Sequence, residues 1–319
     1  MKSFLKEKLK LSVLPLLFLG LLMSSCEDDN EPMPEPMPSM DITTVASSDS
    51  QFSTLVAALD KANLVDDLQA DGPFTVFAPN NAAFLKAGIT SLDGLAANDL
   101  TPILTKHVVS GLLPAARIES GPVATLNSAH NIYISENTDG VFINGRIRVI
   151  DTDVTASNGI IHIIDDVIIP PTQSLIQIAS GDNNFSELVD LVRAANPSVA
   201  AALTNASTAG LTVFAPTNDA FMELYKTMPK ATLLAPENRG LLTDVLLYHV
   251  IPGRFFSTDL PNVSGEVATA SGGKGVMFDL TNGVKIDGKG SQPSTVVNAN
   301  ILATNGLIHV IDRVLLPEM

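Results

Sequence analysis

The chain has 319 residues, a hydrophobic content of 45% and a formal net charge of −15. This length suffices for one large domain or for two domains of roughly 130–150 residues each. So acidic a chain repels phosphate backbones and anionic lipid headgroups, which argues against nucleic acid as a partner and against membrane attachment through charge. Cys26 is the only cysteine, so neither an intrachain disulfide nor a cysteine zinc cluster can form.

The N-terminal segment has the pattern of a secretory signal peptide. Four lysines precede an apolar run over residues 11–23, and two small residues, Ser24 and Ser25, follow it. The run is too short for a comfortable membrane span, and Pro15 interrupts it. We therefore expect residues 1–25 to be removed, which leaves 15 basic and 33 acidic residues and a net charge of −18.

The cysteine stands at the expected cleavage junction. The segment Leu22-Met23-Ser24-Ser25-Cys26 resembles a bacterial lipobox. The resemblance implies cleavage before Cys26, diacylation of its sulfur with palmitate-like chains and acylation of the new amine. Several acyl chains would anchor the protein firmly, since each buried methylene adds about 0.8 kcal/mol. The alternative is an ordinary signal peptide with a chance cysteine.

Residues 26–40 are expected to form the lipid anchor and a spacer. Four alternating prolines between positions 32 and 38 favour an extended, semi-rigid chain. The acidic start, Glu27-Asp28-Asp29, resembles a signal that sends some lipoproteins to the outer face of the outer membrane; a plain solvated linker is the alternative. The predicted location is the cell envelope, as an outer-membrane lipoprotein.

The rest of the chain consists of two copies of one sequence repeat. Residues 74–84 (FTVFAPNNAAF) match residues 211–221 (LTVFAPTNDAF) at eight of eleven positions. Residues 156–170 (ASNGIIHIIDDVIIP) match residues 303–317 (ATNGLIHVIDRVLLP) at nine of fifteen positions. Such ordered repetition predicts two homologous domains. We place them at residues 41–171 and 172–319.

The first half of each unit is expected to be helical. In the first repeat, apolar residues at helical spacing predict one or two helices within residues 50–69 and another over residues 100–108. Between them, residues 74–77 predict a short strand that stops at Pro79. Asn80 or Asn81 is expected to cap the short helix that follows.

The second half of each unit is expected to be a sheet. Residues 141–143 and 146–150 are strand-like and flank Asn144-Gly145, a hairpin signal that Asp287-Gly288 is expected to repeat in the second unit. Residues 160–164 and 167–169 predict final strands. The glycines of Asn158-Gly159 and Asn305-Gly306 are expected to supply positive φ in tight turns before them. Helices followed by strands indicate an α+β fold.

At this point the sequence resembles the fasciclin-like family. The repeated TVFAPxNxAF and NGxIHxIDxVxxP blocks look like its two signature regions, with a helix-borne histidine between them. The resemblance spans residues 41–318. It implies two tandem domains, each a roughly seven-stranded wedge or sandwich with a helical layer. It also implies extracellular proteins that mediate adhesion, without catalysis or a cofactor.

Four of the five histidines occupy paired positions: His107 with His249, and His162 with His309. His107 and His249 fall on the apolar face of a predicted helix, which favours a core role over a ligand or base. His162 and His309 are each followed three residues later by an aspartate, Asp165 or Asp312. An Asp–His pair is half of a catalytic triad, but no G-x-S-x-G nucleophile motif accompanies it.

We interpret all four histidines and both aspartates as structural, with no catalytic, cofactor or metal site. In animal members of the family the Tyr-His element is linked to integrin recognition. Tyr248-His249 matches that element and is a candidate interaction element, although the expected burial argues against it. The first repeat has Lys106-His107 instead.

The sequence therefore predicts a surface-displayed, non-catalytic adhesion or binding module, tethered by its N-terminal lipid. Its expected partner is a protein or a polysaccharide at the cell surface. The alternative is an accessory surface lipoprotein in glycan or nutrient capture. An enzyme that uses His162 or His309 is the least favoured hypothesis.

Overall fold

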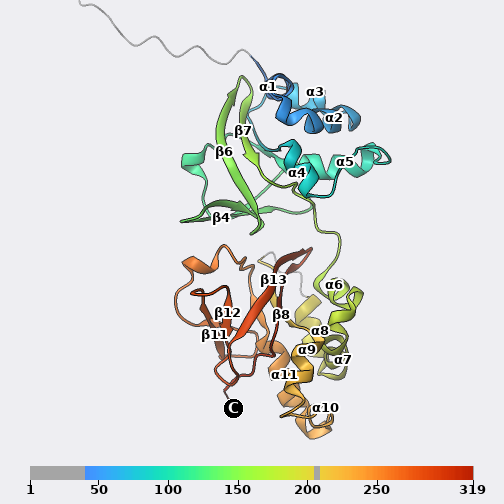
Figure 1. Cartoon of the computed structure of the whole chain (residues 1–319), viewed down its shortest axis with the longest axis vertical. Coiled ribbons are helices and arrows are strands. Elements are labelled where there is room, and N and C mark those ends of the chain that lie inside the picture. Colours follow the sequence, from blue (N-terminus) through green and yellow to red (C-terminus); the bar gives the residue numbers. More distant parts are fainter. Residues whose placement is uncertain (1–39, 205–208, 319) are drawn as a thin grey trace, which may run out of the picture. The chain divides into compact units, whose positions relative to one another are not determined.

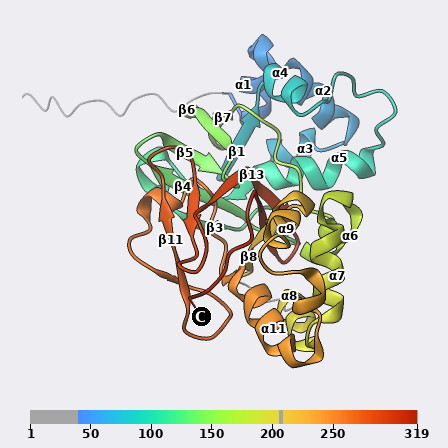
Figure 2. The ribbon, with the colours of Figure 1, turned by 60° about the horizontal axis from the view of Figure 1, so that its bottom comes forward.

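The computed structural model describes residues 40–204 and 209–318. Within them the chain forms the same arrangement of helices and strands twice, with the helices of each repeat gathered beside its sheet (Figures 1 and 2). The predicted signal peptide, Cys26 and nearly all of the predicted spacer lie outside the described residues.

The first repeat begins with helices, as predicted. They are α1 (Ile42–Ser48), α2 (Ser53–Lys61), α3 (Val65–Gln69), α4 (Asn81–Lys86) and α5 (Ala97–Leu104), with the 3-10 turns η1 (Ser50–Phe52), η2 (Thr105–His107) and η3 (Ala115–Arg117). The side chain of Asn80 accepts a hydrogen bond from the Ala83 N–H and caps α4, which confirms the predicted cap. Helix α1, which the side chain of Asp41 caps, was not predicted.

Seven strands follow or interrupt these helices. They are β1 (Phe74–Pro79), β2 (Val108–Ser110), β3 (Gly121–Val123), β4 (Ile132–Asn137), β5 (Gly140–Ile143), β6 (Ile147–Ala156) and β7 (Gly159–Ile164). Their order in the sheet is β2-β1-β7-β6-β5-β4-β3. The β1–β7 pair is parallel and the other pairs are antiparallel.

The second repeat has the same plan. Its helices are α6 (Leu175–Gly181), α7 (Ser186–Ala194), α8 (Pro197–Thr204), α9 (Asn218–Leu224), α10 (Lys230–Leu233) and α11 (Arg239–Tyr248), with the 3-10 turns η4 (Asn183–Phe185), η5 (Pro236–Asn238) and η6 (Leu260–Asn262). Its strands are β8 (Leu211–Pro216), β9 (Val250–Pro252), β10 (Val267–Ala268), β11 (Gly275–Asp279), β12 (Lys285–Asp287), β13 (Ser294–Ala303) and β14 (Gly306–Ile311).

The second sheet repeats the first strand for strand. Its order, β9-β8-β14-β13-β12-β11-β10, places β8 parallel to β14 just as β1 lies parallel to β7. The predicted α+β fold with two tandem seven-stranded domains and a helical layer is thus confirmed.

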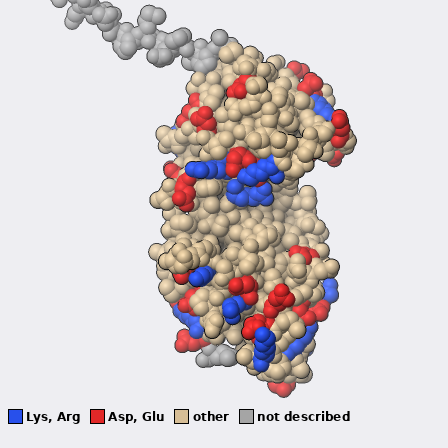
Figure 3. Space-filling view, viewed as in Figure 1, with Lys and Arg blue, Asp and Glu red and all other residues tan. Residues whose placement is uncertain are grey.

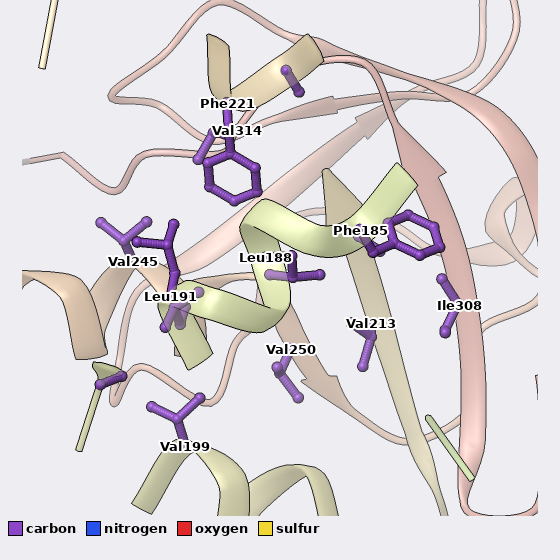
Figure 4. Close-up of a cluster of buried hydrophobic side chains, with 14 of the residues drawn as sticks. Phe185, Leu188, Leu191, Val199, Val213, Phe221, Val245, Val250, Ile308 and Val314 are labelled. Atoms are coloured by element: carbon purple, nitrogen blue, oxygen red, sulfur yellow. The ribbon is translucent and has the colours of Figure 1, made fainter. Parts of the chain in front are cut away.

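Both faces of the central strands are buried, which explains why these strands read as continuous apolar runs. Along β1, Val76 and Ala78 join the core under the helices, whereas Phe77 joins a second cluster on the opposite face. In the second repeat Val213 and Phe214 divide in the same way. Figure 4 shows part of the helix-side core of the second repeat.

The predicted strand at residues 167–169 and the predicted hairpin at Asp287-Gly288 were both wrong. Residues 167–169 form no strand, because the Ile168 N–H donates to the ring of His107 instead of to a neighbouring strand. Asp287-Gly288 does not form a tight hairpin like Asn144-Gly145, where both residues have positive φ. The Asp287 side chain accepts from the Lys289 N–H, and six residues separate β12 from β13.

The glycines at the start of β7 and β14 serve a different purpose from the predicted one. Neither Gly159 nor Gly306 has positive φ. A Cβ atom would lie 2.1 Å from the Phe74 carbonyl oxygen at Gly159 and 2.3 Å from the Leu211 carbonyl oxygen at Gly306. The glycines are therefore required by the close approach of the parallel partner strand.

Candidate functional site

His107 and His249 each join the end of a helix to the segment that follows the central strand. The Nδ1 atom of His249 lies 2.7 Å from the Val245 carbonyl oxygen, and its Nε2 accepts from the Leu315 N–H at 2.9 Å. His107 makes the same two contacts, with the Ile103 carbonyl at 2.8 Å and the Ile168 N–H at 2.9 Å. Both nitrogens of both rings are thus occupied by backbone groups.

These two rings are buried and uncharged. Their exposed fractions are 2% for His107 and 3% for His249, in line with the helical spacing of the sequence. Burial lowers the pKa of each to about 4. A neutral ring with its proton on Nδ1 satisfies both hydrogen bonds, one as donor and one as acceptor.

His162 and His309 form hydrogen bonds at a β-bulge in the neighbouring strand. The Nε2 atoms of His162 and His309 lie 2.8 Å from the carbonyl oxygens of Leu113 and Phe255, respectively. Their Nδ1 atoms accept from the backbone N–H groups of Asp153 and Asn300, which have positive φ where the pairing register shifts. The histidine thus satisfies a donor that the β-bulge removes from the ladder.

The paired aspartates do not contact these histidines. Asp165 accepts from the Arg148 N–H at 2.7 Å, and Asp312 accepts from the Thr295 N–H at 2.7 Å. Each carboxylate therefore fastens the end of the last strand to its antiparallel neighbour. The half of a catalytic triad that the sequence spacing suggested is not assembled at either position.

Tyr248, the other residue of the candidate interaction element, is 1% exposed. Its hydroxyl lies 2.6 Å from the Gly275 carbonyl oxygen and 3.0 Å from that of Gly288, and burial raises its pKa to about 12. Its counterpart Lys106 is equally buried, and its ammonium reaches the carbonyls of His130 and Asn131. Any partner that recognises this element must therefore contact its surroundings.

The burial of Lys106 escaped the sequence analysis, because a lysine is ordinarily a surface residue. Burial lowers its pKa to about 8. The alignment of the repeats indicates this burial, because Lys106 occupies the position of Tyr248. The ammonium of the lysine and the hydroxyl of the tyrosine both donate to backbone carbonyls.

Residues at the surface show a second kind of repetition. Leu85 on α4 and Met222 on α9 are equivalent, and they are 61% and 59% exposed. Ile150 on β6 and Val297 on β13 are also equivalent, and each lies at a register shift of its strand. β-Bulges turn side chains away from the regular alternation, so both repeats present an apolar side chain at the same place.

The helices that carry Leu85 and Met222 are held rigidly. The amide of Asn81 bonds the Thr54 N–H and the Ser50 carbonyl, and Asn218 makes the same bonds to Glu187 and Asn183. These asparagines fix α4 and α9 against the helices before the first strand. The four exposed positions were not predicted, although Leu85 and Met222 directly follow the repeated TVFAPxNxAF block.

Other kinds of site find no support in the described part of the chain. Within residues 40–204 and 209–318 no three His, Cys, Asp or Glu side chains are arranged to hold a metal ion. Among the helices of these residues, none combines the length and the apolar character that a membrane crossing requires.

Comparison with known proteins identifies the family. The chain belongs to the fasciclin domain family, which matches residues 50–170 and 183–317. It is 48% identical over 136 residues to Protein sll1483 of Synechocystis sp., a match that covers 41% of this chain and 74% of that protein. It is 26% identical over 281 residues to transforming growth factor-beta-induced protein ig-h3 of Sus scrofa, covering 87% of this chain but 38% of that protein.

Among solved structures, a FAS1 domain pair from the insect cell adhesion molecule Fasciclin I is similar. The match covers 84% of this chain and 97% of that chain, with 21% sequence identity and a TM-score of 0.42.

The buried histidines make the stability of the protein depend on pH. His107, His249 and His309 have pKa values of about 4 in the fold, below the ordinary value of 6.5. Between these values the unfolded chain binds more protons, so the free energy of unfolding is highest above about pH 6.5 and falls as the pH drops toward 4. Each histidine contributes on the order of 3 kcal/mol to this loss.

Guanidinium unfolding at a series of pH values measures the effect. His249→Asn keeps an amide donor near the Val245 carbonyl and removes one titrating group. It should lower the free energy of unfolding at pH 7. Between pH 6.5 and 4, the free energy of unfolding should fall less steeply with pH than in the unsubstituted protein, by the equivalent of about one bound proton. An unchanged slope in this variant would show that the fold does not lower the pKa of His249.

Proposed function

We propose that this protein is a non-catalytic adhesion or binding protein, held at the cell surface by lipid on Cys26, whose two fasciclin domains bind a protein or polysaccharide. The observation that carries this proposal is the recurrence of exposed apolar side chains at the same positions in both repeats, Leu85 with Met222 and Ile150 with Val297.

The chemistry of the marked residues supports binding over catalysis. A general base needs a nitrogen free to take a proton from a substrate. Both ring nitrogens of His107, His162, His249 and His309 already bond backbone groups. The aspartates that follow His162 and His309 are bonded to strand ends instead.

The surface suits contacts that do not depend on charge. On the face shown in Figure 3, acidic and basic side chains are interspersed and much of the surface is uncharged. Single exposed apolar residues are common on proteins. Two matched pairs in repeats that differ elsewhere are a more selective feature, and two copies of a site increase avidity when both reach the ligand.

The family adds support of its own. Both repeats match the fasciclin domain, at residues 50–170 and 183–317, and the resemblance to this family implies extracellular proteins that mediate adhesion. An N-terminal lipid followed by a proline-rich spacer would place two such domains at the outside of the envelope, where a partner is accessible.

Replacement of the exposed apolar pair tests the binding surface. In cells that display the full chain, Leu85→Gln and Met222→Gln should each weaken attachment to wells coated with collagen, fibronectin or polysaccharide, by about fivefold or more. The double variant should weaken it further, because avidity is lost. Attachment is measured on each coating, so a loss confined to polysaccharide favours glycan capture.

Leu112→Gln provides the matched control. Leu112 is an exposed leucine whose counterpart in the second repeat is Arg254, so it lacks an apolar partner position. This variant should attach as well as the original protein. Equal attachment by all the variants at equal surface density would contradict the proposed surface.

The lipid tether has its own test. In a Gram-negative host, the full chain should incorporate labelled palmitate and sediment with membranes, whereas Cys26→Ser should do neither because it lacks the acylated sulfur. Ser25→Ala, next to it, should behave like the original. Two results would rule out acylation at Cys26 as the anchor. The unsubstituted protein would incorporate no labelled palmitate, or the Cys26→Ser variant would still sediment with membranes.

A further inference from the structure

The second repeat contains an apolar cavity. It lies between α6, α7, α8 and the sheet and has a volume of about 300 Å³. Five side chains that line it, Leu188, Val199, Val213, Val250 and Ile308, come from α7, α8, β8, β9 and β14 (Figure 4). The equivalent space in the first repeat holds only about 20 Å³.

A leucine at the end of a helix accounts for much of the difference. In the first repeat the Asn158 amide donates to the carbonyl of Leu68, and in the second the Asn305 amide donates to that of Leu203. The two leucines are therefore equivalent. Leu68 is buried and fills the space, whereas Leu203 is only partly buried at the edge of the cavity.

The sequence shows why Leu203 lies farther out. The second repeat has four more residues between its first phenylalanine, Phe185, and the strand residue Val213 than the first has between Phe52 and Val76. The helix α8 accordingly has eight residues where α3 has five.

A hydrogen bond that joins two helices in the first repeat is also missing from the second repeat. In the first, the Gln69 side chain donates to the Thr43 hydroxyl at 3.1 Å and ties α3 to α1. The residue equivalent to Thr43 is Ile176, which lines the cavity and offers no hydrogen bond. The gap between α6 and α8 is therefore bordered by apolar groups.

The lining determines what kind of ligand fits. His249 is the titratable group inside, and both of its ring nitrogens bond backbone groups. Ser180, which is exposed, is a polar residue at the rim. The other interior side chains are aliphatic or aromatic, so a buried polar group of a ligand would lose its hydrogen bonds. At the rim, the Arg193 side chain is 71% exposed, and its nearest carboxylate, Asp190, lies 3.9 Å away.

We propose that the second domain binds an aliphatic acid, with its chain in this cavity and its carboxylate at Arg193. The volume is about twice that of a roughly 150 Å³ apolar cavity that takes up benzene, and it lies at the lower end of the range for small-molecule sites. In the first domain the equivalent space is too small for this ligand. A separate hollow of about 270 Å³ beside it is lined in part by the polar residues Asp67 and Thr105. This site is independent of the adhesion surface proposed above.

Calorimetric titration of the full chain with decanoate tests the proposal. One molecule should bind per chain, and saturating decanoate should raise the melting temperature by mass action. Ala200→Phe projects a ring into the cavity from α8 and should weaken binding at least about tenfold. Ala201→Phe makes the same change one residue along the helix, at an exposed position, and should leave binding unchanged.

A milder variant guards against loss of the fold. Val192→Leu introduces the residue that the first repeat has at this position, Leu59, and should weaken binding without lowering the melting temperature. Decanoate binding that survives both Ala200→Phe and Val192→Leu would overturn the cavity as the site, and so would the absence of binding to the original chain.

Decanol tests the head group. It should bind more weakly than decanoate, and Arg193→Gln should remove the difference by weakening decanoate alone. Equal binding of the two probes to the original protein, or no effect of Arg193→Gln, would overturn the assignment of an acidic ligand.

Discussion

In each domain the Nε2 atom of a buried histidine accepts a hydrogen bond from a backbone N–H beyond the central strand, Ile168 for His107 and Leu315 for His249. Its Nδ1 atom bonds a carbonyl one helical turn earlier. The ring thus ties the helical layer to the sheet. It also supplies an acceptor for the segment after the central strand, which pairs with no neighbouring strand. Without that acceptor, the unpaired buried N–H would cost about 1–3 kcal/mol.

The second pair of histidines extends the same constraint to the other side of the central strand. His162 and His309 bond an N–H at the bulge in β6 or β13, and they pack on Phe77 and Phe214 with ring centroids 5.4 Å and 5.6 Å apart. These polar groups are all used in hydrogen bonds within the fold. The surfaces that we propose for recognition are therefore apolar: the exposed side chains of both repeats and the cavity of the second domain.

Much of this frame could be predicted, because local chemistry dictates it. Asn80 caps a helix and Asn144-Gly145 makes a left-handed turn wherever the surroundings permit. Residues 167–169 have the apolar composition of a strand but do not form one. The backbone N–H of Ile168 donates to His107, a residue some sixty positions earlier in the chain, instead of to a neighbouring strand. The requirement for glycine at position 159 was attributed to a positive φ. The actual reason is the carbonyl oxygen of Phe74, which leaves no room for a Cβ and belongs to a strand that is distant in the sequence.

The candidate sites were less accessible to sequence reasoning. Four extra residues before Val213 mark a difference between the repeats, but a cavity depends on where side chains such as Leu203 come to lie. Exposure of Leu85 likewise depends on how α4 is fixed by Asn81. His107 and His249 were placed in the core from their helical spacing, and His162 and His309 were interpreted as structural. The different hydrogen bonds of the two pairs could not be predicted, because they depend on segments that only the fold brings together.

That division is the most direct test of the account. Nitrogen-15 NMR of the imidazole rings at pH 7 distinguishes the two neutral tautomers and the charged ring. The hydrogen bonds place the proton on Nδ1 in His107 and His249 and on Nε2 in His162 and His309. The three rings with a lowered pKa, His107, His249 and His309, should be neutral. A charge on any of these three rings at pH 7, or the same tautomer in all four histidines, would contradict this arrangement.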